Sequence, residues 1–269
     1  MHKFEIYTNT TKDQALEFEH EVCRFLQEQG AECAVHPAEG FAAECCIVLG
    51  GDGTVLRAAE WTRRNRIPIL GINLGTLGYL AQTEKSCWKE ALTQLLQGHY
   101  SVEDRMMIEG FQTGSETDTA SCHALNDIVI GRSGCLRIMN FDVYVGGVLL
   151  NTYRADGIIL CTPTGSTAYN LSAGGPIVDP GAEMMVLTPI CPHQIGVRSI
   201  VLSADSVITI VIHALERDKD MTAVADFDGS ERVELRPEQP FVVRRSREIT
   251  RLVKLEDRSF LETLRRKMN

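Results

Sequence analysis

The sequence has few basic residues for its number of acidic ones, and this shortage excludes one large class of partner. It holds 27 lysines and arginines against 36 aspartates and glutamates, a formal net charge of -9. Such a charge argues against nonspecific binding to nucleic acid, so no nucleic-acid partner is expected. An anionic substrate would need a locally basic site, for which the candidates are Arg57, Arg132, Arg137 and Arg154.

A long apolar run is also missing. No stretch reaches the roughly 20 apolar residues that a transmembrane helix needs. The first residues enter a strand, Lys3 to Thr8, without the pattern of a signal peptide. We therefore expect a cytoplasmic protein that has no membrane partner.

The nine cysteines are odd in number and include no Cys-x-x-Cys pair. This favours reduced thiols in a cytosol over a framework of disulfides. The Cys191-Pro192-His193 cluster offers too few ligands for a tetrahedral zinc site. No fixed metal site is therefore expected in the protein itself.

Length and composition predict a folded protein. The chain has 269 residues, of which 44% are hydrophobic, with no internal repeat and no low-complexity segment. That is enough apolar material for a core, in one large domain or two modest ones.

Strands and helices alternate over the first hundred residues. Their apolar spacing predicts, in order, a strand at Lys3–Thr8, a helix at Asp13–Gln29, a strand at Cys45–Leu49, a helix beginning near Val55, a strand at Pro68–Ile72 and a helix at Trp88–Gln97. Such alternation is typical of a parallel, Rossmann-like sheet. We predict an α/β domain over residues 1–99.

After residue 100 the pattern changes to short strands with period two. Examples are Met106–Glu109, Ala124–Ile130, Ile138–Val145 and Val207–Ile212. Gly146-Gly147 and Asp228-Gly229 are hairpin signals between such strands. We predict a β-rich domain, a β-sandwich, over residues 100–255, followed by a helix within residues 256–269 that packs back on the first domain.

The most informative stretch is Gly50-Gly51-Asp52-Gly53-Thr54. It lies between a buried strand and a helix, where open α/β sheets bind ligands. Glycines let a ligand approach the backbone, and N–H groups at a helix start favour phosphate. A carboxylate beside phosphates is repelled unless it binds a metal or takes a proton. That conflict indicates chemistry at Asp52.

A tight turn with Asp52 as the helix N-cap is the structural alternative. Two other nucleotide loops are excluded. No Gly-Lys-Ser/Thr follows, so the loop is not a Walker A motif. Leu56 stands where a dinucleotide fingerprint has its third glycine.

A second polar constellation begins at Asp156-Gly157 and runs through a hydroxyl-rich loop, Thr162 to Pro176. Hydroxyls and helix N–H groups can bond ribose, base edges and phosphate without adding charge. Tyr169 adds a ring that can lie against a base or ribose. The structural alternative is an ordinary serine- and threonine-rich turn with a capped helix.

The glycine loop resembles that of NAD kinases and of diacylglycerol and sphingosine kinases, and phosphofructokinases carry a close variant. The remaining motifs are similar to the bacterial NAD kinases, in the same order and over nearly the whole chain. They are the Asn73–Leu80 loop, Asn126-Asp127, Asp156-Gly157, the Thr164–Tyr169 loop and Asp228-Gly229. The long run from Asp156 to Pro176 separates NAD kinases from the lipid kinases.

This resemblance implies transfer of the terminal phosphate of ATP, or of polyphosphate, to the 2′-hydroxyl of the adenosine ribose of NAD. It implies Asp52 as the catalytic residue and a phosphate loop of Gly50, Gly51, Gly53 and Thr54. The NAD contacts that it implies are Asp52, Gly53, Arg57, Asn126, Asp127, Arg154, Asp156, Thr167, Ala168, Tyr169, Asn170, Leu171, Ser172 and Cys191. Relatives often have alanine in place of Cys191.

The resemblance further implies a divalent metal, Mg²⁺ or Mn²⁺, that arrives with ATP, and a homodimer or homotetramer. It also gives the β-rich domain its expected roles in NAD binding and oligomerisation. Two rival functions are a lipid kinase of the diacylglycerol or sphingosine type and a noncatalytic nucleotide-binding regulator. A lipid kinase should expose an apolar groove or interfacial helix, and a regulator would not need Asp52.

Overall fold

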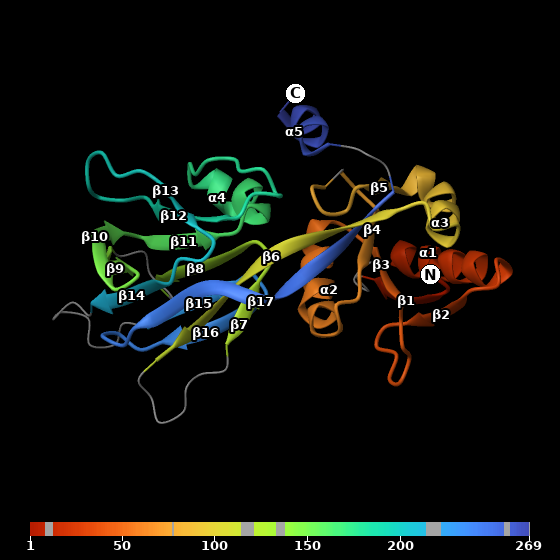
Figure 1. Ribbon diagram of the computed structural model, residues 1–269, viewed down its shortest axis with the longest axis horizontal. Helices are drawn as coiled ribbons and strands as arrows, with labels where there is room; N and C mark the ends of the chain where they lie inside the picture. The colour runs from red at the N-terminus through yellow and green to blue at the C-terminus, as the bar shows by residue number, and fades with distance from the viewer. Residues whose placement is uncertain are drawn as a thin grey trace. The chain divides into compact units, whose positions relative to one another are not determined.

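The computed structural model describes residues 1–8, 13–76, 78–113, 121–132, 138–213, 222–255 and 259–268. The chain forms two compact units (Figure 1). The first contains Met1–Arg105 together with Ile249–Asn269, and the second contains Met106–Glu248. The second unit is therefore inserted into the sequence of the first.

The first unit is built on a parallel sheet with the order β4-β3-β1-β2. Its strands are β1 (Lys3–Thr8), β2 (Glu32–Val35), β3 (Cys45–Leu49), β4 (Ile69–Asn73) and the short β5 (Thr83–Glu84). Leu252, near the end of β17 (Phe241–Lys254), pairs in parallel with Ile69. Its helices are α1 (Asp13–Glu28), α2 (Asp52–Asn65), the 3-10 turn η1 (Lys85–Cys87), α3 (Trp88–Leu96) and α5 (Phe260–Met268).

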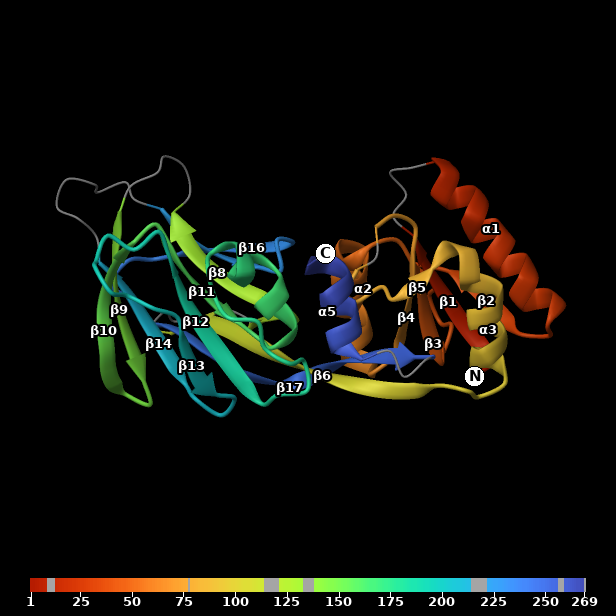
Figure 2. The same cartoon turned by 90° about the horizontal axis from the view of Figure 1, so that it is seen from above.

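Helices cover both faces of this sheet (Figure 2). Every residue of β3 is buried, as the apolar run requires of a strand that is covered on both sides. Phe18 and Leu26 of α1 pack with Leu92 of α3 and with alternate residues of β1, β3 and β4 in one hydrophobic cluster. Val55 of α2 lies beside the opposite face, at Gly71.

The second unit contains two antiparallel sheets. One holds β10 (Val148–Ala155), β9 (Met139–Val145), β14 (Ile208–His213), the first part of β17, the second part of β6 (Ser101–Gln112) and β7 (Cys122–Ala124). The other has the order β13 (Ile200–Ser203), β12 (Met184–Ile190), β11 (Gly157–Cys161), β8 (Asp127–Arg132), β15 (Ala223–Phe227) and β16 (Glu231–Leu235). A 3-10 turn η2 (Thr164–Thr167) and a short helix α4 (Tyr169–Ser172) follow β11.

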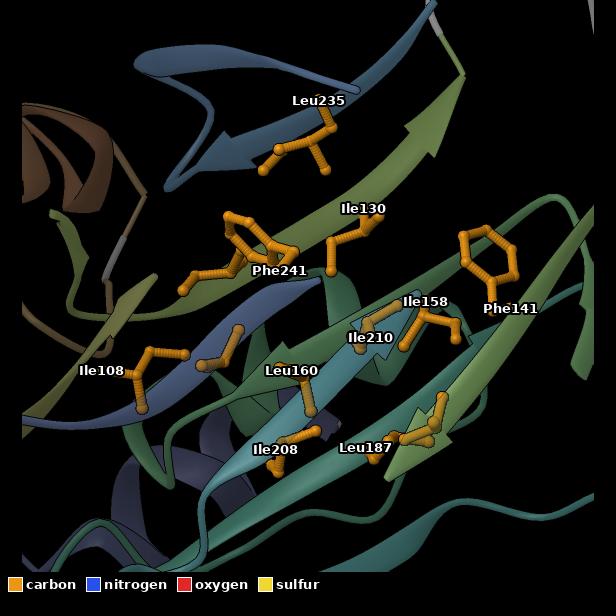
Figure 3. Close-up of a cluster of buried hydrophobic side chains, with 14 of the residues drawn as sticks. Ile108, Ile130, Phe141, Ile158, Leu160, Leu187, Ile208, Ile210, Leu235 and Phe241 are labelled. Atoms are coloured by element: carbon orange, nitrogen blue, oxygen red, sulfur yellow. The ribbon is translucent and has the colours of Figure 1, made fainter. Parts of the chain in front are cut away.

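The inner faces of these two sheets share one apolar core, shown in Figure 3. Alternate residues of β9 and β14 are buried, which is the period-two pattern of a strand with one face on a core. Phe141, Ile158 and Phe241 are among the fully buried side chains. The predicted combination of an α/β part and a β-sandwich is confirmed.

The hairpin predictions are also confirmed. Gly146 and Gly147, at φ +58° and +83°, join β9 to β10. Asp228 and Gly229, at φ +53° and +70°, lie between β15 and β16. Positive φ at consecutive residues is the requirement that favours glycine and aspartate in such turns.

One strand prediction is wrong in its extent. Ala124–Ile130 was expected as a single strand, but the chain leaves the sheet at Leu125 and Asn126, between β7 and β8. The N–H groups of both residues donate to the carboxylate of Asp228 instead of to a neighbouring strand. No helix among the described residues is long and apolar enough to cross a membrane.

Candidate functional site

The glycine loop of the first unit leaves open space next to its backbone. A Cβ added at Gly51 or at Gly53 would meet no atom within 4 Å. A Cβ at Gly50, by contrast, would lie 2.3 Å from the Thr54 hydroxyl oxygen, so the turn itself requires glycine there. The loop therefore combines a tight turn with backbone that a ligand can approach.

Asp52 is the first residue of α2, and its carboxylate reaches a second loop. Its Oδ2 accepts the N–H of Tyr79 at 2.8 Å, and its Oδ1 accepts those of Leu80 and Ala81, both at 3.0 Å. The helix N-cap is Gly51, which has no side-chain cap bond. The N-cap alternative for Asp52 is therefore wrong, because this carboxylate holds the 79–81 loop.

The chain leaves no room for a side chain where this loop meets Asp52. A Cβ at Gly78 would fall 1.9 Å from Asp52 Oδ1. The glycine spacing of the Asn73–Leu80 stretch thus lets the backbone reach the carboxylate. Oδ2 accepts a single bond from the described residues, so it retains lone-pair capacity for a proton.

The second unit contains a cavity of about 590 Å³. Four of the residues expected to bind NAD line it, namely Asn126, Asp127, Ala168 and Tyr169. The candidate cation Arg132 lines it as well. The remaining lining residues are Val129, Gly131, Val224, Asp226, Asp228, Gly229 and Arg232.

Asp228 holds one wall of this cavity. Its Oδ2 accepts the N–H of Leu125 at 2.7 Å, and its Oδ1 accepts those of Asn126 and Asp127 at 2.8 and 3.0 Å. Burial raises the pKa of Asp228 to about 6, against the opposing effect of these N–H donors. The carboxylate therefore keeps Leu125 and Asn126 out of the regular strand and holds Asn126 and Asp127 at the cavity.

The cavity is acidic. Burial, together with the charges of Asp228 and Asp226, raises the pKa of Asp127 to about 7, although the Tyr169 N–H donates to its carboxylate. Asp226 pairs with Arg232, whose Nε donates to Oδ2 at 2.6 Å. Three carboxyl groups thus meet two guanidinium groups, those of Arg132 and Arg232, around one hollow.

The hydroxyl-rich loop is packed against the Asn126 segment. A Cβ at Gly165 would lie 2.1 Å from the Asn126 carbonyl oxygen, so only glycine permits this approach. The Thr162 hydroxyl donates to the Leu125 carbonyl and accepts the N–H of Gly165. The Ser166 and Thr167 hydroxyls donate to the carbonyls of Pro163 and Thr164, so several of the hydroxyls that suggested ligand contacts have partners within the chain.

Asn170 is fully buried and makes bonds in three directions. Its Nδ2 donates to the carbonyls of Ser166 and Pro176, and its Oδ1 accepts the Thr188 hydroxyl. The neighbouring Tyr169 and Leu171 are 46% and 41% exposed. In this segment the exposed side chains remain available to a ligand, whereas the Asn170 amide orders the loop.

Other predicted residues are not among those that line this cavity. Arg154 is an exposed residue of β10 whose N–H donates to Gln194, and the Asp156 carboxylate is 4.0 Å from His193 Nε2. Cys191 is exposed at φ +45°. Thr167 is half-buried at the end of η2, and Ser172 is exposed at the end of α4.

Arg57 lines a different hollow, in the first unit, with Tyr7, His36, Glu60 and Trp61. The candidate Arg137 lies outside the described residues. Within the described part of the chain, no group of three or more histidine, cysteine or acidic side chains could hold a metal ion.

The sequence reasoning missed Asp226, Asp228 and Arg232 as cavity residues. Asp228 was recognised for its turn conformation and family motif alone. The signal that could have found Asp226 is its place next to the apolar Phe227, since successive residues of a strand point to opposite faces. Fully buried Phe227 points to the core, so Asp226 faces away from it. Asp228 lies beyond the end of β15, at φ +53°, where this alternation does not apply.

Comparison with known proteins agrees with this arrangement. Residues 32–100 match the ATP-NAD kinase N-terminal domain, and residues 125–255 match the ATP-NAD kinase C-terminal domain. An NAD kinase of Lachnoclostridium phytofermentans is 41% identical over 281 residues, covering 99% of both chains. One of Lachnospira eligens is 41% identical over 293 residues, covering all of both chains.

Two solved structures share the fold. An NAD kinase from Archaeoglobus fulgidus in complex with ATP superposes with a TM-score of 0.81 at 24% identity, covering 98% of both chains. Yeast NADH kinase complexed with NADH gives a TM-score of 0.80 at 24% identity, covering 97% of this chain and 85% of that one. Since both domain profiles are matched in order and the relatives align over their full length, the chain belongs to the ATP-NAD kinase family.

Proposed function

We propose that this chain performs its family's reaction, phosphorylation of NAD by ATP to give NADP, with Asp52 as the catalytic base. The observation that carries the role of Asp52 is its carboxylate, fixed by three backbone N–H groups beside an open glycine loop. A base held in one orientation is ready to accept a proton from a positioned hydroxyl.

Besides a base, phosphoryl transfer requires of the protein mainly that it align the reactants and neutralise charge. Phosphoryl transfer proceeds through a loose transition state, so alignment and charge neutralisation supply most of the catalysis. In this proposal the 2′-hydroxyl of the adenosine ribose attacks the terminal phosphorus of ATP, ADP leaves, and Asp52 takes the hydroxyl proton. Gly50, Gly51, Gly53 and Thr54 form the phosphate loop. A divalent metal, Mg²⁺ or Mn²⁺, arrives with ATP and offsets the phosphate charge.

The cavity of the second unit is our candidate for NAD binding. Asn126 and Asp127 offer acceptors for ribose hydroxyls or base amino groups, and the half-exposed ring of Tyr169 offers a stacking surface. We keep Arg57, Arg154, Asp156, Thr167, Leu171, Ser172 and Cys191 as proposed contacts. For Asn170 we propose a contact through its backbone, because its amide is committed to Ser166, Pro176 and Thr188.

The complexes of relatives support these substrates. The Archaeoglobus fulgidus NAD kinase is in complex with ATP, and the yeast NADH kinase is complexed with NADH. We propose ATP as the donor and NAD as the acceptor, with polyphosphate as the alternative donor. No observation favours a lipid kinase.

We also propose a homodimer or homotetramer in the cytoplasm. The hairpin strand β10 is the edge of its sheet, and it exposes Val148, Leu149 and Leu150 at 72%, 51% and 36%. An exposed apolar edge strand is a surface that proteins normally cover, here by a second copy of the chain. The described cysteines are free thiols, which supports a reducing compartment.

The direct test is to incubate the protein with NAD and Mg·ATP and to measure NADP with an NADP-specific dehydrogenase. We expect NADP to form, and NAD to raise the melting temperature, since a ligand that binds the native state stabilises it. Parallel reactions with diacylglycerol and sphingosine should yield no phosphorylated lipid. Lipid phosphorylation without NADP formation would overturn the assignment.

A further inference from the structure

Two thiols of the first unit lie in contact. Cys23 on α1 and Cys33 on β2 have their sulfur atoms 2.8 Å apart, and both are half-buried free cysteines. Four other described cysteines, Cys45, Cys46, Cys122 and Cys161, are buried, while Cys87 and Cys191 are exposed. Each thiol of the Cys23–Cys33 pair therefore lies next to a second thiol and is also accessible to small solutes.

Regular structure positions both residues of the pair. On α1, Cys23 is adjacent to Val22, and Val22 and Leu26 are fully buried against the sheet. Cys33 pairs in register with Phe4 in the parallel ladder between β2 and β1. The sulfur atoms need to approach by roughly 0.8 Å to reach covalent S–S distance, a shift within the range of side-chain rotation.

The two thiols are not equivalent. Cys33 donates its S–H to the sulfur of Cys23, and this bond lowers the pKa of Cys23 despite burial and the nearby Glu19. The same bond, with burial, raises the pKa of Cys33. Because thiolates are the reactive form, Cys23 has the character of an attacking thiol and Cys33 that of the resolving thiol.

We propose that Cys23 and Cys33 form a peroxide-sensitive dithiol site that closes to a disulfide between α1 and β2. The Cys23 thiolate attacks one oxygen of hydrogen peroxide, the O–O bond breaks, and the released hydroxide takes a proton to become water. The sulfur of Cys33 then attacks the Cys23 sulfenic acid, and the S–O bond breaks with loss of a second water. The thiols lose two electrons, which peroxide accepts.

The disulfide has a structural consequence. It closes the short segment that turns through Gln29 and Gly30 and joins the end of α1 to the outermost strand of the sheet. A cross-link of this kind restricts the unfolded chain and so stabilises the folded one. Neither thiol takes part in the proposed catalytic function, so the disulfide and NADP formation are tested independently.

Peptide mapping tests the proposal on the intact protein. Trypsin cleaves after Arg24, between the two cysteines, so a disulfide links two otherwise separate peptides. After a stoichiometric dose of hydrogen peroxide we expect the linked pair, which dithiothreitol separates, and a melting temperature higher by roughly 5 °C in the oxidised form. Absence of the linked pair at a dose that oxidises the exposed Cys87 would overturn the proposal.

Three variants make the assignment specific. The Cys33-containing peptide also carries Cys45 and Cys46, so Cys33→Ser must abolish the link and leave a dimedone-reactive sulfenic acid on Cys23. Cys23→Ser must abolish the link without comparable dimedone labelling of Cys33. Cys87→Ser, the matched control at an exposed cysteine, should retain the link and the thermal shift. A link that survives in Cys33→Ser would also refute the pair.

Discussion

Each unit contains an aspartate whose carboxylate accepts three backbone N–H groups of a loop. We call this arrangement a clamp, and the two clamps are alike in detail. Asp52 binds residues 79–81 and Asp228 binds residues 125–127, in both cases with one bond to Oδ2 and two to Oδ1. Their surroundings differ. Asp52 begins a helix beside glycines that leave open space, whereas Asp228 shares a cavity with Asp127 and Asp226.

In the proposed mechanism Asp52 alone of the two is the base, so hydrogen-bond geometry by itself does not make an aspartate catalytic. The same three-bond clamp serves a loop suited to phosphate in one unit and an acidic wall in the other. The groups around the two carboxylates differ. Asp52 lies at the start of a helix beside open backbone, whereas Asp228 lies beside other carboxylates. Substitution of each aspartate should therefore affect different properties.

The largest effect is expected from Asp52→Asn. Loss of a general base typically costs on the order of 10²–10⁴ in rate, so NADP formation should nearly cease. The NAD-dependent rise in melting temperature should persist, because the cavity of the second unit is unchanged. Asp104→Asn, which removes an exposed partner of Arg251, is the matched control and should keep wild-type turnover.

A substitution at Gly78 can separate the two roles proposed for Asp52, holding the 79–81 loop and acting as the base. Gly78→Ala places a methyl group against Asp52 Oδ1 and disturbs the loop, but it leaves the carboxylate in place. We expect it to lose less activity than Asp52→Asn, and to unfold at a lower temperature than the wild type in thermal unfolding. Equal loss of activity in both variants would reduce Asp52 to a positioning residue.

A smaller effect, on stability, is expected from Asp228→Asn. The asparagine amide would face an N–H donor, and an unsatisfied buried donor costs about 1–3 kcal/mol. The melting temperature should fall by roughly 5 °C, with a weaker response to NAD. Asp179→Asn is the control, because that exposed carboxylate accepts, among the described residues, the single N–H of Gly181. Equal stability of the two variants would remove the clamp role of Asp228.

The smallest effect concerns pH and Asp127. Its pKa, raised to about 7 in the folded protein, means that the folded state keeps a proton that the unfolded state releases near pH 4. The free energy of unfolding therefore falls as pH rises from about 4 to 7, and the loss is complete above that. Asp127→Asn lacks this titration, so its melting temperature should fall less than that of the wild type between pH 5 and pH 8. Parallel curves would contradict the raised pKa.

The sequence predicted those parts of the fold that local patterns control. The run Cys45–Leu49 is apolar throughout and forms β3 with those bounds, and Gly146-Gly147 forms the predicted hairpin. The break between β7 and β8 could not be predicted, since it depends on Asp228, about a hundred residues further along the chain. Local pattern carries no information about such a distant acceptor.

The candidate site also contains residues that local pattern predicts and residues that only tertiary packing brings together. Asp52 stood out because glycines flank it, and Asn126 and Tyr169 were found through the family motifs. The contribution of Asp226 and Arg232 depends on two neighbouring strands bringing them together, and the inward hydrogen bonds of Asn170 depend on Thr188 of β12. These relations arise from tertiary packing.

The insertion of one unit into the other has a consequence for biosynthesis. Every residue of Met106–Glu248 emerges from the ribosome before Leu252, which pairs with Ile69, and Val253, which joins the first core. The β-sandwich can thus fold on the nascent chain before the α/β unit has received the last strand of its sheet. Translation begins with the α/β unit, yet that unit is the second to be completed.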